Sequence, residues 1–158
     1  MELYHGSNQI VENPKLLSPT HPMDFGNGFY TTANYKQAEA FAHRVVRLRG
    51  YNPVVNVYEF DEEDISNCKT LKFDEPNAEW LHFVVANRKM EYKNENYELV
   101  IGPVADDDVY ETITALENGI YDEEEALKRL KIKKLYNQYV FKTQEIMNKL
   151  VFRGSKNV

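Results

Sequence analysis

The sequence predicts an α+β fold in a single domain, and three observations support this prediction. The chain has 158 residues, which is the length of one domain and is enough to bury a core. Strand-like and helix-like segments follow one another in irregular order, which does not match a doubly wound parallel sheet. The chain contains 11 Tyr and 8 Phe, so aromatic side chains must fill much of the core.

The first part of the chain predicts three strands and one long helix. Strands are expected at residues 2–5 and 29–32, with a loop rich in Asn and Pro between them. Asn34 can cap a helix from about Tyr35 to Arg49, whose apolar residues have helical spacing. Residues 54–60 alternate and are rich in Val, which predicts the strongest strand of the chain.

The second part of the chain predicts further helices and strands. Pro76 suits the first turn of a helix that reaches Arg88. The acidic residues 106–108 and 122–125 favour the starts of two more helices, and we interpret them so rather than as metal sites. Strands are expected at 70–73, 98–101, 138–141 and 150–152, the last two on either side of a short helix.

The charge of the chain is unevenly distributed. The net charge of −6 divides into −14 over residues 1–125 and +8 over residues 126–158. Two interpretations remain open: a basic face for an acidic acceptor or nucleic acid, and a solvated helix and strand edged with Lys. The single Cys68 fits a reducing cytoplasm, and no apolar run is long enough for a membrane span or resembles a signal peptide. We therefore expect a cytoplasmic protein without a membrane partner.

The common catalytic motifs are missing from this sequence. The four His residues have no metal-ligand spacing with one another or with Cys68, so no metal site is expected. The Gly26-Asn27-Gly28 stretch is followed by aromatic residues rather than by Lys and a helix start, so it is not a phosphate-binding loop. Residue chemistry alone therefore indicates no more than an α+β domain.

Three separated motifs add a resemblance. They are His5-Gly6-Ser7, Gly26-Asn27-Gly28-Phe29-Tyr30 and Asn137-Gln138-Tyr139-Val140-Phe141. Together they resemble ADP-ribosyltransferases of the poly(ADP-ribose) polymerase, or His-Tyr-Glu, type. Further stretches, such as Asp24-Phe25-Gly26 and Val100-Ile101-Gly102-Pro103-Val104, are similar to a bacterial family known as domain of unknown function 3990. The resemblance implies one domain over residues 1–158, with a split mixed β-sheet and flanking helices.

The resemblance also implies an NAD site. In such enzymes the residue matching His5 bonds a ribose hydroxyl of NAD, and the backbone matching Gly6 holds the nicotinamide carboxamide. Ser7 would then help to hold the adenosine-side ribose. Tyr30 matches the Tyr that stacks on nicotinamide, and Phe41 has the spacing of an aromatic on the opposite face. For Phe41, packing in the core is an equally good interpretation at this stage.

The chain departs from the family pattern at Gln138, where chain-building relatives carry Glu. Glutamine keeps an acceptor oxygen but lacks the negative charge that stabilises a ribosyl oxocarbenium. Ala38 stands where relatives often carry a Ser that touches the carboxamide. Two hypotheses therefore remain: a mono-ADP-ribosyltransferase in which His5, Tyr30 and Gln138 act on NAD, and a catalytically silent module that binds NAD or ADP-ribose.

Partners and additional site residues follow from the same resemblance. It implies a bacterial toxin or effector with a macromolecular acceptor, either protein or nucleic acid, and a small antitoxin protein. Arg88 and the aspartates 106 and 107 are candidates for positions near the site, with a structural ion pair as the favoured interpretation of Arg88. A substitute carboxylate from Glu59 or Glu79 is disfavoured, because one ends a core strand and the other opens a helix.

Overall fold

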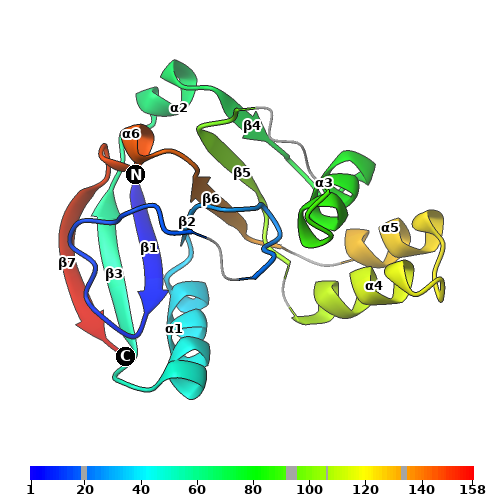
Figure 1. Cartoon of the computed structure of the whole chain (residues 1–158), viewed down its shortest axis with the longest axis horizontal. Helices are drawn as coiled ribbons and strands as arrows, with labels where there is room; N and C mark the ends of the chain where they lie inside the picture. Colours follow the sequence, from blue (N-terminus) through cyan, green and yellow to red (C-terminus); the bar gives the residue numbers. More distant parts are fainter. Residues whose placement is uncertain (19–20, 92–95, 106, 133–134) are drawn as a thin grey trace.

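A single mixed sheet runs through the molecule, and apolar side chains are buried against it in two clusters. The computed structural model describes residues 1–18, 21–91, 96–105, 107–132 and 135–158. Within this part of the chain the sheet has seven strands in the order β4-β5-β6-β2-β1-β3-β7 (Figure 1). The strands are β1 Glu2–Ser7, β2 Phe29–Thr32, β3 Val54–Glu59, β4 Thr70–Lys72, β5 Leu99–Pro103, β6 Asn137–Phe141 and β7 Val151–Asn157.

The strand pairing is antiparallel except between β4 and β5, which run parallel. β1 pairs with β3 over six residue pairs, from Glu2 opposite Glu59 to Ser7 opposite Val54. By contrast, β1 and β2 share the single pair Tyr4–Thr32. The two strands therefore separate beyond this pair, and the sheet is split at its centre.

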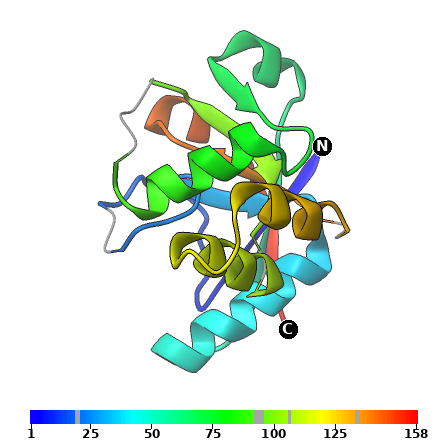
Figure 2. The same cartoon turned by 90° about the vertical axis from the view of Figure 1, so that its right-hand side faces the viewer.

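The helices pack on the sheet and cap its ends. In the described residues they are α1 Tyr35–Arg49, α2 Glu63–Asn67, α3 Ala78–Arg88, α4 Asp107–Glu117, α5 Glu123–Lys131 and α6 Gln144–Met147. The side chain of Asn34 accepts a hydrogen bond from the Gln37 N–H and so caps α1, as the sequence predicts. Figure 2 shows α3, α4 and α5 grouped in front of the sheet, with α1 below them.

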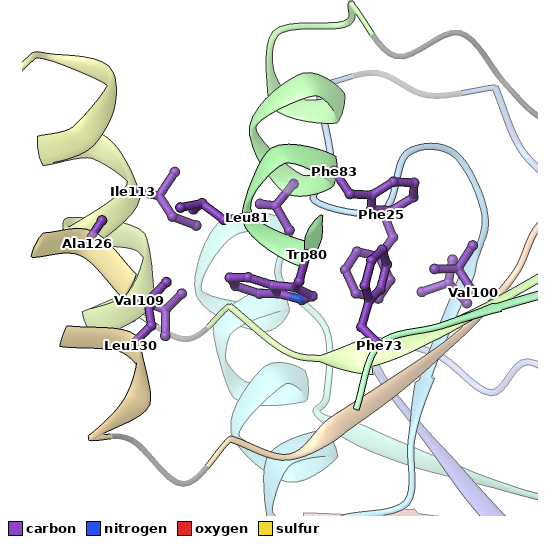
Figure 3. Close-up of a cluster of buried hydrophobic side chains, with 12 residues drawn as sticks. Phe25, Phe73, Trp80, Leu81, Phe83, Val100, Val109, Ile113, Ala126 and Leu130 are labelled. Atoms are coloured by element: carbon purple, nitrogen blue, oxygen red, sulfur yellow. The ribbon is translucent and has the colours of Figure 1, made fainter. Parts of the chain in front are cut away.

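Buried apolar residues form two clusters. The first joins α3, α4 and α5 to the sheet; Trp80 lies between a group of Phe rings and the aliphatic residues of α4 and α5 (Figure 3). The Trp80 Nε1–H donates to the Pro103 carbonyl at 3.0 Å, which satisfies its buried polar atom. The second cluster contains residues of β1, β2, β3, β5 and β6, so it joins both sides of the split.

The α+β class is confirmed, but several details of the sequence prediction differ. The short helix α2 follows β3 and is absent from the prediction, because five residues give too little periodicity to detect. Pro76 precedes the cap residue Asn77, so it lies outside α3 rather than in its first turn. β7 continues to Asn157 because it pairs along the whole of β3. Asp106 lies outside the described residues, and α4 begins at Asp107.

Candidate functional site

A cavity of about 510 Å³ lies where β1 and β2 separate, within the size range of small-molecule sites. Its walls come from α1, from the ends of the central strands, and from the segments before β2 and after β5. The lining residues are Tyr4, Gly6, His21, Pro22, Met23, Asp24, Tyr30, Thr31, Thr32, Gln37, Ala38, Ala40, Phe41, Arg44, Val104, Ala105, Tyr110 and Gln138.

The structure does not bring His5 to the wall of this cavity, although both its neighbours on β1 line it. The His5 Nδ1–H donates to the backbone carbonyl of Tyr30 at 2.7 Å, since a carbonyl can only accept. The ring also packs against Phe29, with 4.4 Å between ring centroids. Burial lowers the pKa of His5, so the ring is neutral and its Nε2 carries a lone pair. His5 thus connects β1 to β2 where their ladder has ended.

Gly6 lines the cavity, and its missing side chain has a structural use. A Cβ at this position would stand 2.0 Å from the Ala38 carbonyl oxygen and 2.8 Å from the Ala42 nitrogen. The resemblance implies a close contact between the Gly6 backbone and a ligand. In the structure, the element that packs closely against Gly6 is α1. Ser7 is buried opposite Val54 on β3 and is not among the lining residues.

The ring of Tyr30 lines the cavity while its hydroxyl holds the preceding loop. The hydroxyl donates to the Gly26 carbonyl at 2.6 Å and accepts from the Phe25 N–H at 3.1 Å. Burial raises the pKa of Tyr30 above its usual range, so the hydroxyl remains protonated and keeps this donor. Lys142 also donates to the Phe25 carbonyl at 2.5 Å, so two side chains fix the loop before β2.

Phe41 and Gln138 complete the wall from opposite directions. Phe41 lies on α1 with 43% of its surface exposed, so its interpretation as a core residue is wrong. It lines the cavity, which is compatible with the other interpretation, an aromatic ring beside a ligand. Gln138 lies on β6 opposite Thr32 and Gly102 and is buried. Its Nε2 is one of two buried side-chain nitrogens in the described residues without a hydrogen-bond partner, and the other is Nη1 of Arg88. A buried donor of this kind calls for an explanation.

Comparison with protein families identifies the chain. Residues 1–152 match the family described as Protein of unknown function (DUF3990). The chain belongs to this family. No curated protein and no solved structure matches it.

Asp24 is a lining residue that the sequence prediction did not select, although it opens one of the motifs shared with DUF3990. Burial raises the pKa of Asp24 to about 6, the Arg88 guanidinium opposes this rise and the Glu117 carboxylate adds to it. The available signal was a lone acid between Met23 and Phe25, both apolar, in a segment without strand or helix periodicity. Such a signal is too weak to distinguish a site residue from a loop residue.

Arg88 contacts the cavity wall through Tyr110 and does not itself line the cavity. Its guanidinium carbon is 3.8 Å from the centroid of the Tyr110 ring, and its Nη2 is 3.9 Å from Oε2 of Glu117. These contacts support the structural interpretation of Arg88, while Tyr110 itself lines the cavity.

The remaining candidates lie elsewhere or outside the described side chains. Glu59 is exposed and pairs with Arg153 on β7, and Glu79 is exposed in the first turn of α3. Neither lines the cavity, as the sequence analysis favoured. Asp106 and the side chain of Asp107 lie outside what the structure describes. Among the described residues, no three His, Cys, Asp or Glu are grouped as metal ligands, and no helix is long and apolar enough to cross a membrane.

Proposed function

We propose that this DUF3990 chain has an ADP-ribosyltransferase-like fold and acts as an NAD-dependent mono-ADP-ribosyltransferase. It would cleave the bond between ribose C1′ and the nicotinamide nitrogen and pass ADP-ribose to a protein or nucleic acid. One observation carries the proposal: Gly6, Tyr30, Phe41 and Gln138, from four separate elements, line one cavity. These are the positions at which the motifs resemble NAD-dependent transferases.

The chemistry of the cavity wall suits each part of NAD. The rings of Tyr30 and Phe41 offer flat apolar surface to the positively charged nicotinamide ring. Arg44 lies one turn beyond Phe41 on α1 and also lines the cavity, so its positive charge suits the diphosphate. His5 lies outside the lining, so a ribose hydroxyl would have to enter between β1 and β2 to reach the lone pair of its Nε2. Gly6 follows His5 on β1 and lines the cavity, so its backbone would contact the carboxamide, whereas Ser7 lies outside the lining and has no part in this proposal.

Gln138 supplies polar groups where the oxocarbenium would form. Its amide oxygen can accept the ribose 2′-hydroxyl, and its unpartnered Nε2 is a donor for an oxygen of the ligand. Compared with a carboxylate, the neutral amide forgoes about 1–2 kcal/mol of transition-state stabilisation, or roughly five- to thirty-fold in rate. A slow enzyme that transfers single ADP-ribose units tolerates this loss, whereas chain elongation does not.

A second candidate is a catalytically silent module that binds NAD or ADP-ribose on the same fold. The neutral Gln138 and the apolar Ala38 in the cavity wall favour it. The resemblance to toxins and effectors favours the enzyme, acting in the bacterial cytoplasm and inhibited by a small antitoxin protein. Under this proposal, overexpression slows bacterial growth and His5→Ala relieves the effect.

Labelled NAD tests the proposal with purified protein in bacterial lysate. Wild type is compared with His5→Ala and Gln138→Glu, and the matched controls are His43→Ala on the exposed face of α1 and Gln9→Glu on an exposed loop. We expect label on a macromolecule and free nicotinamide with wild type and both controls, a large loss with His5→Ala, and about ten-fold faster transfer with Gln138→Glu.

Two results would decide against the enzyme. Activity gained only in Gln138→Glu would identify the silent binding module. A thermal shift with NAD that is absent from wild type, or equal in wild type, His5→Ala and Tyr30→Ala, would exclude the proposed NAD site itself.

A further inference from the structure

The proposed transfer needs a group that accepts a proton, and the neutral Gln138 cannot be that group. As the acceptor's oxygen or nitrogen attacks ribose C1′, it must lose its hydrogen. Asp24 is the one carboxylic acid among the described residues that line the cavity. It shares the cavity wall with Gln138, Val104, Ala105 and Tyr110, all lining residues.

The backbone around Asp24 is fixed on both sides. The Gly26 N–H donates to the Met23 carbonyl at 2.9 Å, which closes a turn around Asp24 and Phe25. The Phe25 ring is fully buried and faces Gly102, where an added Cβ would stand 3.1 Å from its Cζ. Since Gly102 is paired with Gln138, the segment that carries Asp24 is packed against the strand pair that carries Gln138. The backbone that carries the Asp24 carboxylate is therefore fixed before a ligand arrives.

The charged and titratable groups around Asp24 come from α1, α3, α4, β1, β2 and the segment before β2. Arg88 on α3 lies behind it, but the nearest ion pair of Arg88 is with Glu117 on α4. Nη1 of Arg88 is buried without a hydrogen-bond partner in the described residues. The other titratable groups that line the same cavity are Tyr4, His21, Tyr30, Arg44 and Tyr110.

We propose that Asp24 is the general base of the transfer reaction, an inference that rests on the proposed function. Its carboxylate accepts the proton from the O–H or N–H of the acceptor while the acceptor atom bonds to ribose C1′. The bond from C1′ to the nicotinamide nitrogen breaks, and neutral nicotinamide leaves with the electron pair. Water in place of the acceptor gives ADP-ribose and nicotinamide by the same step.

The charge network provides a test that a purely structural role would not satisfy. A general base acts when ionised, so the rate should rise with pH through the Asp24 pKa of about 6. Arg88 lowers this pKa and Glu117 raises it. Arg88→Gln should therefore move the acidic limb of the pH–rate profile to higher pH, and Glu117→Gln should move it to lower pH.

The experiment measures nicotinamide release and label transfer from NAD between pH 5 and 9. Wild type is compared with Asp24→Asn, Arg88→Gln and Glu117→Gln, with Asp74→Asn as the control at an exposed acid outside the cavity. We expect Asp24→Asn to lose about 100-fold or more in turnover while its thermal shift with NAD is retained. Asp74→Asn should match wild type, and the two network variants should shift the acidic limb in opposite directions.

The outcomes separate the two proposals. Turnover in Asp24→Asn equal to that of wild type, or network variants that leave the acidic limb unmoved, would overturn the role of Asp24 and leave the transferase intact. An absence of turnover in wild type at every pH would instead overturn the transferase, and the role of Asp24 with it.

Discussion

At the residue scale, Asp24 places a carboxylate where folding disfavours its charge. Burial is the largest cause of its raised pKa, and the nearby guanidinium of Arg88 offsets only part of this effect. Groups that destabilise the folded state occur at functional sites, because activity can require a strained or destabilised arrangement there. The energetic environment of Asp24 thus agrees with a role in chemistry better than with a role in packing.

Asp24→Asn should therefore stabilise the protein at neutral pH. The folded pKa of about 6 lies above the ordinary value of 3.8, so between pH 4 and 6 the folded state binds more protons than the unfolded state. The free energy of unfolding of wild type, compared with that of Asp24→Asn, consequently falls as the pH rises from 4 to 6. Urea unfolding should show the variant more stable than wild type by about 2–3 kcal/mol at pH 7.5, with most of this difference absent at pH 4. A variant that is less stable at pH 7.5 would contradict a net desolvation penalty at Asp24.

Individual site residues were predictable from sequence where they belong to a motif. They were not predictable where only the packing of distant segments brings them to the cavity. Tyr30 and Gln138 line the cavity as the resemblance implies, whereas His5 and Ser7 do not reach its wall. Phe41 remained ambiguous because an apolar stripe has the same spacing whether it faces a core or a cavity. Asp24 was missed since its place in the cavity and its interactions with Arg88 and Glu117 involve residues far away in the sequence.

At the element scale, the contact between α1 and β1 depends on Gly6. The helix lies so close to the strand that any side chain at this position meets helix backbone, which cannot move aside as a flexible side chain can. The same contact places Ala38 and Phe41 at the cavity. Packing of the helix and the shape of the site are therefore coupled through one glycine.

Gly6→Ala should destabilise the protein by about 3 kcal/mol or more, because overpacking against backbone forces α1 to shift. Gly119→Ala is the matched control: Gly119 has φ of 72° with no atom within 4 Å of an added Cβ, so the change there tests backbone strain alone. We expect Gly119→Ala to lower the free energy of unfolding by about 1 kcal/mol, measured by urea unfolding. Equal losses in the two variants would indicate that α1 does not press on β1.

Elements with strong local signals were predictable, and elements defined by their partners were not. α1 has its cap, its periodicity and its terminal Gly50, and its bounds match the prediction. The end of β7 is fixed by pairing with β3, and its polar residues 153–157 show no strand pattern of their own. Among the described basic residues after residue 125, Lys149 pairs with Asp64 and Arg153 with Glu59, and such exposed pairs favour the solvated-face interpretation of their charge.

At the scale of the whole molecule, the split sheet is held together on its buried side. The second cluster brings Leu3 and Tyr58 from one side of the split into contact with Leu99 and Phe141 from the other. The order of the strands could not be read from periodicity, because pairing between strands far apart in sequence leaves no local pattern. Residues from all three motifs, Gly6, Tyr30 and Gln138, line one cavity although they lie far apart in the sequence.

A shared cluster predicts that the domain unfolds in one step. The single Trp80 is buried among α3, α4 and α5, so its fluorescence reports that side of the molecule, whereas circular dichroism reports the whole. We expect the two signals to give the same urea midpoint within error. Separate midpoints would mean that the two sides of the sheet unfold independently and that the chain contains two cooperative units.

The pairing of β2 with β6 also determines at which stage of folding the cavity is completed. Thr31 Oγ1 donates to the Tyr139 carbonyl across 108 residues of sequence, and Gln138 reaches the cavity only through this pairing. Such distant pairing closes late, because a long loop must be ordered first. The lining residues on β1, β2 and α1 precede residue 60, whereas Val104, Ala105, Tyr110 and Gln138 come later in the chain. The cavity therefore lacks its Gln138 wall until β6 has paired with β2.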